Sequence, residues 1–469
     1  MDHSRVVVFV IIIFASLVIS PTGVAADTAH EISAPVGQTS STTVPITQQL
    51  QLNPETTGSI HVTTSVDVTL KLKQFGLYIN DSAQRVNVNG FSRTNTEDSI
   101  AGYDRYEWDG NTRTPSISYN LNVNTTNDNG KYKTVDAGEW AIVEVPSVPY
   151  SWRASEEIEI VNDHEIDGSG VIKRGFAFLG DHAIRTATAR DQQFRLVIPD
   201  AANLTESPEA ILDNVAYASK QLQVGERDSD VVMIAAPTSD DIKWARGGTA
   251  RDAIFWTQDT ARLDSPDNIW LHEYIHTRQG FDRTNDFEWF AEGSAEYYAA
   301  LFTLQQEQIG FEEFRTHLTV SDSRQANAIL TKTKDSAQPQ YTKGGLVAAR
   351  SDQRIRDATN ASLTEIFGRL NAADESVSNA EFLRYVRLYS SAAVESDIRD
   401  ATTTTRSLKM WDRQGHQEAF GVEPHTTKST VDVTDETAER GDSNPVTTWI
   451  LVLVALNVVV YGGYKIYTG

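Results

Sequence analysis

The most informative part of this sequence is His272-Glu273-Tyr274-Ile275-His276, and a second stretch, Trp289-Phe-Ala-Glu-Gly-Ser-Ala-Glu-Tyr-Tyr298, follows closely. Residues four apart lie one above the other on an α-helix. The two histidines of the first stretch can therefore face one point, with the carboxylate between them beside it. A surface helix whose histidines and glutamate are only solvated is the alternative.

The residue types in these two stretches indicate a zinc site. Glu292 lies sixteen residues after the second histidine, and Glu296 lies one helical turn further on. One of these carboxylates can join His272 and His276 as a third ligand and leave a fourth position for water, and the other can accept the free ring N–H of a ligand histidine. We therefore predict Zn as the cofactor.

Helix boundaries support this placement. Ser265-Pro266 is typical of an N-cap and first turn, and Gly280 is typical of a helix end. We predict one helix between these boundaries and a second one from about residue 287 to residue 306. A metal site built from both stretches requires that these two helices lie next to each other.

The two stretches, followed by Gln340-Tyr341-Thr-Lys-Gly344, resemble the gluzincin metallopeptidases of the aminopeptidase N and glycyl aminopeptidase type. The resemblance covers about residues 247 to 370, the core of a thermolysin-like domain. It implies that Glu292 is the third metal ligand, that Tyr341 stabilises the tetrahedral intermediate, and that Glu296 supports a ligand histidine. It also implies a peptide or protein substrate.

Two departures from that family bear on specificity. Fifteen residues separate His276 from Glu292, where the family usually has eighteen, so the intervening loop must differ. The family also carries an acidic residue on an upstream strand that holds the substrate's amino terminus, and the nearest match, Arg246-Gly247-Gly248-Thr-Ala-Arg251, has no acid at the corresponding place. Aminopeptidase and endopeptidase modes both stay open. Gly247 and Gly248 either let a substrate backbone approach or form a turn.

The expected chemistry assigns a role to each side chain. Glu273 is the predicted general base, because zinc lowers the pKa of a water toward 7 and the carboxylate can take its proton. Tyr341 is the predicted donor to the developing oxyanion. A non-catalytic surface or adhesion protein with a vestigial site is the alternative from another class, and hydrolysis of a non-peptide substrate is a third reading.

Both ends of the chain carry targeting signals. Residues 1–26 read as a secretory signal peptide, with an apolar run from Val6 to Ile19 and a small-residue exit at Val24-Ala25-Ala26. Residues 446–465 are nearly continuous apolar sequence and predict a transmembrane anchor. The acidic, Thr-rich residues 426–445 between the folded part and this anchor are typical of a stalk. We predict a single-pass cell-membrane protein with an extracellular catalytic domain.

The amino-acid composition limits the environments in which the protein can work and the partners it can bind. The net charge is −23, and Arg outnumbers Lys about two to one. Such an excess of carboxylates repels itself in dilute buffer and is tolerated where concentrated salt screens it, which favours a halophilic, archaeal source over a merely acidic secreted protein. The sequence has no stripe of basic residues that would favour binding to nucleic acid. The chain has no cysteine, so it has neither disulfides nor thiolate ligands. Nothing indicates an oligomeric state.

The fold class predicted for the whole chain is α+β. Period-two alternation, clearest at Val66 to Leu72 and at Ile117 to Val123, predicts an N-terminal antiparallel β domain over residues 27–165. A thermolysin-like metallopeptidase domain follows over residues 166–425, with a mixed β lobe and a helical lobe from about residue 264. Ser207-Pro208 and the capping boxes at Ser362 and Ser378 predict helix starts.

Overall fold

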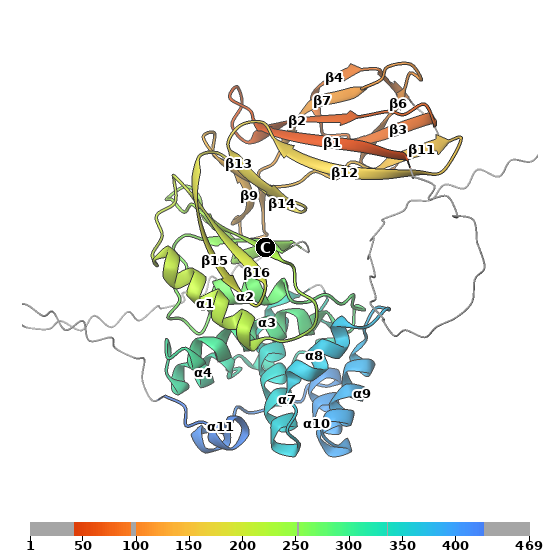
Figure 1. Cartoon of the computed structure of the whole chain (residues 1–469). Helices are drawn as coiled ribbons and strands as arrows, with labels where there is room; N and C mark the ends of the chain where they lie inside the picture. The colour runs from red at the N-terminus through yellow and green to blue at the C-terminus, as the bar shows by residue number, and fades with distance from the viewer. Residues whose placement is uncertain (1–41, 95–99, 251–252, 335, 426–469) are drawn as a thin grey trace, which may run out of the picture. The chain divides into compact units, whose positions relative to one another are not determined.

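The computed structural model describes residues 42–94, 100–250, 253–334 and 336–425. The predicted signal peptide, stalk and transmembrane anchor lie outside these residues. Within the described ranges, no helix is long and apolar enough to cross a membrane. The described residues form a mixed α+β structure in which β-sheets precede a mainly helical C-terminal part (Figure 1).

Two sheets form the first part of the chain and enclose a core that includes Val44, Leu50, Val62, Leu77 and Tyr119. The first sheet has the strand order β12-β1-β2-β7-β4 and the second has the order β11-β3-β6-β5. Their strands are β1 (Thr42–Leu52), β2 (Ser59–Val66), β3 (Leu72–Asn80), β4 (Gln84–Asn89), β5 (Phe91–Thr94), β6 (Tyr103–Trp108), β7 (Ser116–Asn122), β11 (Tyr150–Ala154) and β12 (Ile158–Ile166).

The prediction of a purely antiparallel domain was wrong in one pairing, because β1 pairs with β12 in parallel. Alternation reports which face a residue takes but not which strand it joins, so the sequence could not reveal this partner. The alternating run Val66 to Leu72 was also misread as a strand. It spans the connection between β2 and β3, where the Leu72 amide donates to the Thr69 carbonyl and Leu70 is 97% exposed.

A third sheet, ordered β13-β14-β10-β9-β8, spans the domain boundary predicted near residue 165. Its strands are β8 (Thr125–Thr126), β9 (Tyr132–Asp136), β10 (Ala141–Glu144), β13 (Gly170–Lys173) and β14 (Phe176–Leu179). The buried side chains of Trp140 and Phe178 pack in one cluster with Trp244, which forms an isolated bridge with Tyr132, and with Trp256 of the following sheet. The boundary itself stays a prediction.

A fourth sheet, ordered β15-β16-β17-β19-β18, carries the upstream part of the candidate site. It contains β15 (His182–Ala189), β16 (Gln192–Pro199), β17 (Asp230–Ala236), β18 (Gly247–Ala250) and β19 (Ile254–Gln258). Its central strands β16, β17 and β19 are parallel, and its outer strands are antiparallel, as expected of a mixed β lobe. Helix α1 (Pro208–Gln221) connects β16 to β17 and begins at Ser207, whose side chain accepts from the Ala210 amide.

Helices make up the rest of the described chain, and in Figure 1 α7, α8, α9 and α10 lie together below the fourth sheet. Their bounds are α2 (Ile269–His276), α3 (Glu288–Gln305), α4 (Phe311–Leu318), α5 (Ser323–Ala326), η1 (Leu330–Lys332), α6 (Ala337–Pro339), the π-helix η2 (Gln340–Gly344), α7 (Gly345–Ala358), α8 (Leu363–Asn371), α9 (Asn379–Tyr389), α10 (Ala392–Thr403) and α11 (Arg413–Phe420). Apolar residues of these helices share one core with α1 and the fourth sheet.

The structure confirms some helix starts and corrects one. Ser362 forms the predicted capping box with Glu365, and Ser378 caps α9 by accepting from the Glu381 amide. The helix predicted to begin at Ser265-Pro266 instead begins at Ile269. Its N-cap is Asn268, whose side chain accepts from the Leu271 amide and is itself buried. A buried cap anchored by tertiary contacts thus prevails over the local Ser-Pro signal.

Candidate metal centre

Three side chains from α2 and α3 converge on one point. The Nε2 atom of His272 lies 3.1 Å from Nε2 of His276 and 3.2 Å from Oε2 of Glu292, and His276 Nε2 lies 3.4 Å from the same oxygen. Two ligand atoms at tetrahedral positions around zinc, with bonds of about 2.0–2.1 Å, are about 3.3 Å apart. These three atoms therefore have the spacing of ligands around a single zinc ion.

Helix α2 is held in place by a buried polar network. The amide of the Asn268 side chain donates to Asn214 of α1, at 3.2 Å, and to the Leu263 carbonyl. The Tyr274 hydroxyl, on the helix face away from Glu292, donates to the side chain of Gln192 in β16 at 2.9 Å. Both contacts fix the rotation of α2 about its axis, so that His272 and His276 face α3.

Helix α3 reaches the site because a glycine lets it pack closely. A Cβ on Gly293 would stand 2.6 Å from the carbonyl carbon of Gly344 in η2, which no real side chain permits. The buried residues around it, including Trp289, Phe290 and Tyr297, then carry α3 through the core. The close contact brings the π-helix with Tyr341 to the same side of α3 as Glu292 and Glu296.

Each histidine also has a partner for its other ring nitrogen. Nδ1 of His272 lies 3.4 Å from Oε2 of Glu296, and Nδ1 of His276 lies 3.0 Å from the side-chain oxygen of Gln279. Gln279 is fixed in turn because its amide donates to the Ala291 carbonyl at 2.8 Å. Such contacts set the tautomer and orientation of metal-binding imidazoles.

Glu296 is the centre of a small ionic cluster. Its Oε2 accepts from Arg246 at 2.7 Å, and its Oε1 lies 2.7 Å from Nε2 of His317 in α4. Arg246 also pairs with Asp267, and its guanidinium lies 4.8 Å from the centre of the Tyr341 ring. The cluster therefore joins α3, α4, η2 and the segment before β18. It surrounds Nδ1 of His272, the ring nitrogen that does not face Glu292.

The charges of this cluster perturb the pKa values of its members. Burial opposes the ionisation of Glu292 and Glu296, yet neighbouring imidazoles outweigh it and hold both pKa values below the usual range, with Arg246 contributing at Glu296. Burial and Arg246 lower the pKa of His272, but the two carboxylates prevail and raise it to about 9. Because a ligand imidazole must be neutral, a cation binding here displaces a proton.

Tyr341 lies on the π-helix η2, beside His272, and the ring centroids of the two side chains are 5.6 Å apart. Burial, and then the charge of Glu292, raise the pKa of Tyr341 above its ordinary value, so the phenol keeps its proton. Isolated π-helical turns are rare and are frequent at functional sites. Two residues further on, the buried ammonium of Lys343 donates to the carbonyls of Ala328 and Thr404, at 2.7 and 3.1 Å.

Gly247 and Gly248 do not form a turn. Both belong to β18, the last strand in the order of its sheet, and pair with β19. A Cβ on Gly247 would stand 2.3 Å from the Glu273 carboxylate, and one on Gly248 would stand 2.5 Å from the Trp256 indole nitrogen. The carboxylate of Glu273, only 5% exposed, therefore lies against the strand at Gly247.

All residues singled out from the sequence thus meet at one site, which lies on α2, α3, η2 and β18. The sequence did not reveal Arg246, Gln279, His317 or Lys343. Lys343 stands within the quoted Gln340 to Gly344 stretch, and Gln279 follows His276 at a spacing of three, so a search for partners near each motif would have found these two. Arg246 begins the quoted Arg246 to Arg251 stretch, but its contact with Glu296 depends on tertiary packing. His317 comes from α4, which packs against α3.

His416 lies away from the candidate metal centre. It is buried in α11 among Phe311, Trp411 and Phe420, and its ring centroid is 4.4 Å from that of Phe420. Among the described residues, the one group of three or more His, Asp or Glu side chains with metal-binding spacing is His272, His276 and Glu292.

Comparison with known proteins yields a match in structure alone. No protein-family model and no curated protein matches the sequence. The fold is similar to that of an aminopeptidase N family protein from Idiomarina loihiensis, with a TM-score of 0.56, 12% identity, and coverage of 79% of this chain and 78% of that one. The predicted α+β fold, with β-sheets before a mainly helical part, is thereby confirmed, and the thermolysin-like domain that the gluzincin resemblance implies stays a prediction.

Two further solved structures align less closely. One is an M1 zinc metallopeptidase mutant from Deinococcus radiodurans bound to a Tyr-Ser-Ala substrate, with a TM-score of 0.48, 13% identity, and coverage of 79% and 95%. The other is aminopeptidase A from Legionella pneumophila in complex with aspartic acid, with a TM-score of 0.44, 11% identity, and coverage of 78% and 49%.

Zinc is the cofactor that fits the donor set. Two imidazole nitrogens and one carboxylate oxygen are the protein ligands of many catalytic zinc sites, which keep one position for water or substrate. His272, His276 and Glu292 supply such a set, with no thiolate. Their partners Glu296 and Gln279 supply the outer contacts that such sites require.

Proposed function

We propose that this protein is a zinc-dependent peptidase that hydrolyses peptide bonds, with Glu273 as its general base. The observation that carries the proposal is the convergence of His272, His276 and Glu292, with the Glu273 carboxylate on the same helix. The likeness of the fold to an aminopeptidase N family protein supports it. The roles of the site residues predicted from the sequence are part of this proposal.

The proposed roles follow from charge and position. Zinc bound by the three ligands would lower the pKa of a water molecule and polarise the substrate carbonyl. Glu273, buried against Gly247, accepts the proton of the attacking water and returns a proton to the leaving amine. Tyr341, whose raised pKa keeps it protonated, donates a hydrogen bond to the oxygen that becomes negative.

The same proposal includes a role for β18. An extended peptide can pair with the outer edge of this strand at Gly247 and Gly248, since β18 ends its sheet. Such pairing would place the substrate backbone beside Glu273. The termini of the released fragments decide between aminopeptidase and endopeptidase action.

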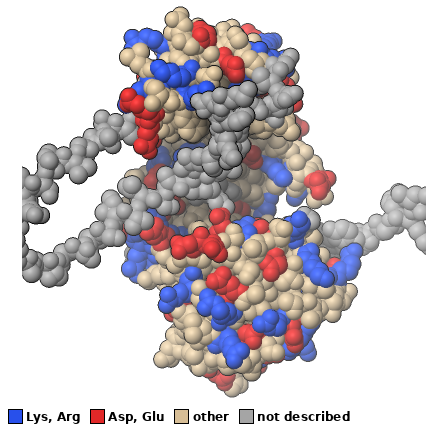
Figure 2. Space-filling model, turned by 90° about the vertical axis from the view of Figure 1, so that its right-hand side faces the viewer, with Lys and Arg blue, Asp and Glu red and all other residues tan. Residues whose placement is uncertain are grey.

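We also propose that the catalytic part is extracellular, anchored by residues 446–465 in the cell membrane, and adapted to concentrated salt. The apolar ends of the sequence and the net charge of −23 support this setting. On the face that Figure 2 shows, acidic and basic side chains are interspersed. Cell fractionation with protease shaving of intact cells tests the location.

The test of function compares the purified protein with its Glu273→Gln variant in molar salt. We expect both to hold one zinc ion. The wild type should cleave a library of unmodified peptides, and the variant should lose about 10²–10⁴-fold in rate, because it lacks only the base. Equal cleavage by the two proteins, or none by the zinc-loaded wild type, would refute the peptidase and leave a surface protein with a vestigial site.

A further inference from the structure

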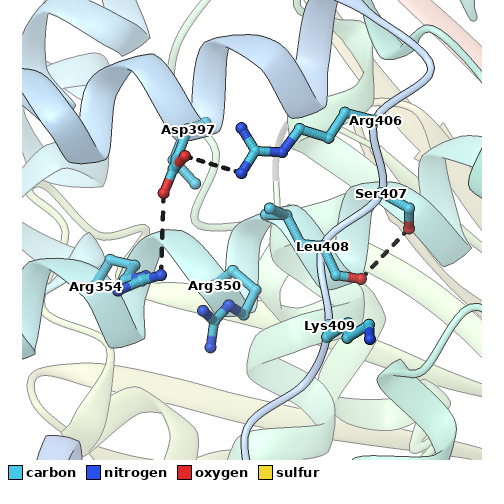
Figure 3. A pocket seen from close by; sticks show the side chains of 8 residues that line it. Arg350, Arg354, Asp397, Arg406, Ser407, Leu408 and Lys409 are labelled. Atoms are coloured by element: carbon cyan, nitrogen blue, oxygen red, sulfur yellow. Dashed lines mark hydrogen bonds and ion pairs between the residues drawn. The ribbon is translucent and has the colours of Figure 1, made fainter.

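A cluster of basic side chains lies away from the metal centre, between α7, α10 and residues 406–409 (Figure 3). These elements enclose a pocket of about 230 Å³. Its lining includes four basic residues, Arg350, Arg354, Arg406 and Lys409, and one carboxylate, Asp397. A local excess of positive charge stands out in a chain whose net charge is −23.

The single carboxylate in the lining is shared between two of the cations. Asp397 lies 3.9 Å from Arg354 and 3.0 Å from Arg406, and Figure 3 draws both contacts. Arg406 also pairs with Asp400 at 3.0 Å, so its charge is balanced. Asp397 and Asp400 thus balance Arg406. Asp357 is a further carboxylate near Arg350 and Arg354, and it alone does not neutralise these two arginines and Lys409.

Arg350 is the least satisfied member of the cluster. Its Nε atom is buried and has no hydrogen-bond partner among the described residues. Burial, and then the charge of Arg354, lower the pKa of its guanidinium, and Asp357 and Asp397 counter this only through space. An arginine keeps its charge even so. The structure thus maintains an unfavourable positive charge at the wall of a pocket.

We propose that this pocket binds a small multivalent oxyanion, represented by inorganic phosphate. Guanidinium groups form charge-assisted, often paired hydrogen bonds with phosphate oxygens. A tetrahedral anion can accept from α7 and from residues 406–409 at once, which a monovalent carboxylate or chloride cannot do as fully. The volume of about 230 Å³ corresponds to roughly eight water molecules at about 30 Å³ each, so the anion fits together with part of its hydration.

Such an anion would hold the segment after α10 against α7. The segment is already tied at its start, because the carbonyl of Thr404 accepts from Lys343. A bound anion at Arg406 and Lys409 adds a second tie a few residues later. The expected consequence is a higher melting temperature, since a ligand that binds only the folded state stabilises it.

The test titrates the purified protein with inorganic phosphate in a calorimeter, at an ionic strength held constant with chloride. We expect one phosphate per chain and a rise in melting temperature of a few degrees. Arg350→Gln should weaken phosphate binding at least tenfold. The matched control is Arg384→Gln on α9, an exposed arginine that pairs with Glu381 outside the pocket, and it should bind phosphate like the wild type.

Lys409→Gln provides a second variant that does not depend on a buried residue, and it should also weaken binding. The proposal is overturned if phosphate gives neither heat nor a melting shift beyond that of chloride, or if both pocket variants bind it as the wild type does. Equal binding of acetate and phosphate would likewise overturn the assignment to a multivalent oxyanion. None of these outcomes depends on peptidase activity.

Discussion

Gly293 in α3 and Gly344 in η2 touch through their backbones: a Cβ on Gly293 would stand 2.6 Å from the Gly344 carbonyl carbon. This contact sets the distance between the helix that carries Glu292 and the π-helix that carries Tyr341. The spacing of the metal ligand and the phenol therefore depends on a position where only glycine fits.

Gly293→Ala should push η2 away from α3. Although alanine is the better helix former by about 1 kcal/mol, overpacking should cost about 1–3 kcal/mol of unfolding free energy. Urea unfolding measures this cost, and peptide turnover should fall as Tyr341 moves. Gly280→Ala is the matched control, because a Cβ there meets nothing closer than 3.7 Å. Equal stability of the Gly293 variant and the wild type would contradict the close packing.

Glu296→Gln should weaken zinc binding by about 10–100-fold, the usual effect of removing a partner of a ligand histidine. The carboxylate accepts from Arg246 and lies 3.4 Å from His272 Nδ1, so its loss frees that ring and leaves Arg246 with Asp267 as its remaining ion-pair partner. Competition with a chromophoric chelator measures the affinity. Glu288→Gln on the same helix, which removes the partner of Arg283, should leave the affinity unchanged.

Lys343→Met should lower kcat about tenfold or more and leave KM nearly unchanged. The ammonium fixes η2 by donating to the carbonyls of Ala328 and Thr404, and the proposed mechanism uses neither of these residues. Misplacing a group that acts in the transition state reduces turnover more than binding. Steady-state kinetics on one peptide gives both constants. Lys332→Met, at an exposed lysine nearby, serves as the control, and a rise in KM alone would argue against a positioning role.

His416 should make the protein less stable in mild acid. Burial, and then Arg356, lower its pKa from 6.5 to about 4. Between these values the unfolded chain binds a proton that the folded chain does not. Stability from this group is therefore full above pH 6.5 and declines as the pH falls toward 4, by up to ~3 kcal/mol.

Urea unfolding at pH 7 and at pH 4.5 measures this effect in the wild type and in His416→Phe. The aromatic surroundings of His416 suit a phenylalanine, which cannot titrate. The wild type should lose about 2–3 kcal/mol more than the variant between the two pH values. Identical losses would show that His416 does not titrate in this range.

Local periodicity explains what the sequence could predict. His272 and His276 share a helix face because of their spacing alone, and Glu292 and Glu296 follow from the next helix. The start of α2 could not be predicted from the sequence, because Asn268 caps this helix and is held by a contact with α1 that no local sequence pattern reveals. Arg246 could not be assigned, since its approach to Glu296 depends on where β18 joins its sheet.

The sheets illustrate the same limit. Alternation identified β7 correctly, but it also suggested a strand where Leu70 is exposed in a connection, and it gave no sign that β12 pairs with β1 in parallel. A period-two pattern encodes two faces and not a neighbour. Strand partners depend on the whole set of strands that compete for an edge.

Zinc-edge X-ray absorption of the purified, zinc-loaded protein identifies the side chains that hold the metal. We expect one zinc per chain with two imidazole nitrogens and oxygen ligands at about 2.0–2.1 Å, and Glu292→Ala should lower the zinc affinity. A zinc ion with fewer than two imidazoles, or an affinity that does not change without Glu292, would contradict a site in which His272, His276 and Glu292 share one ion.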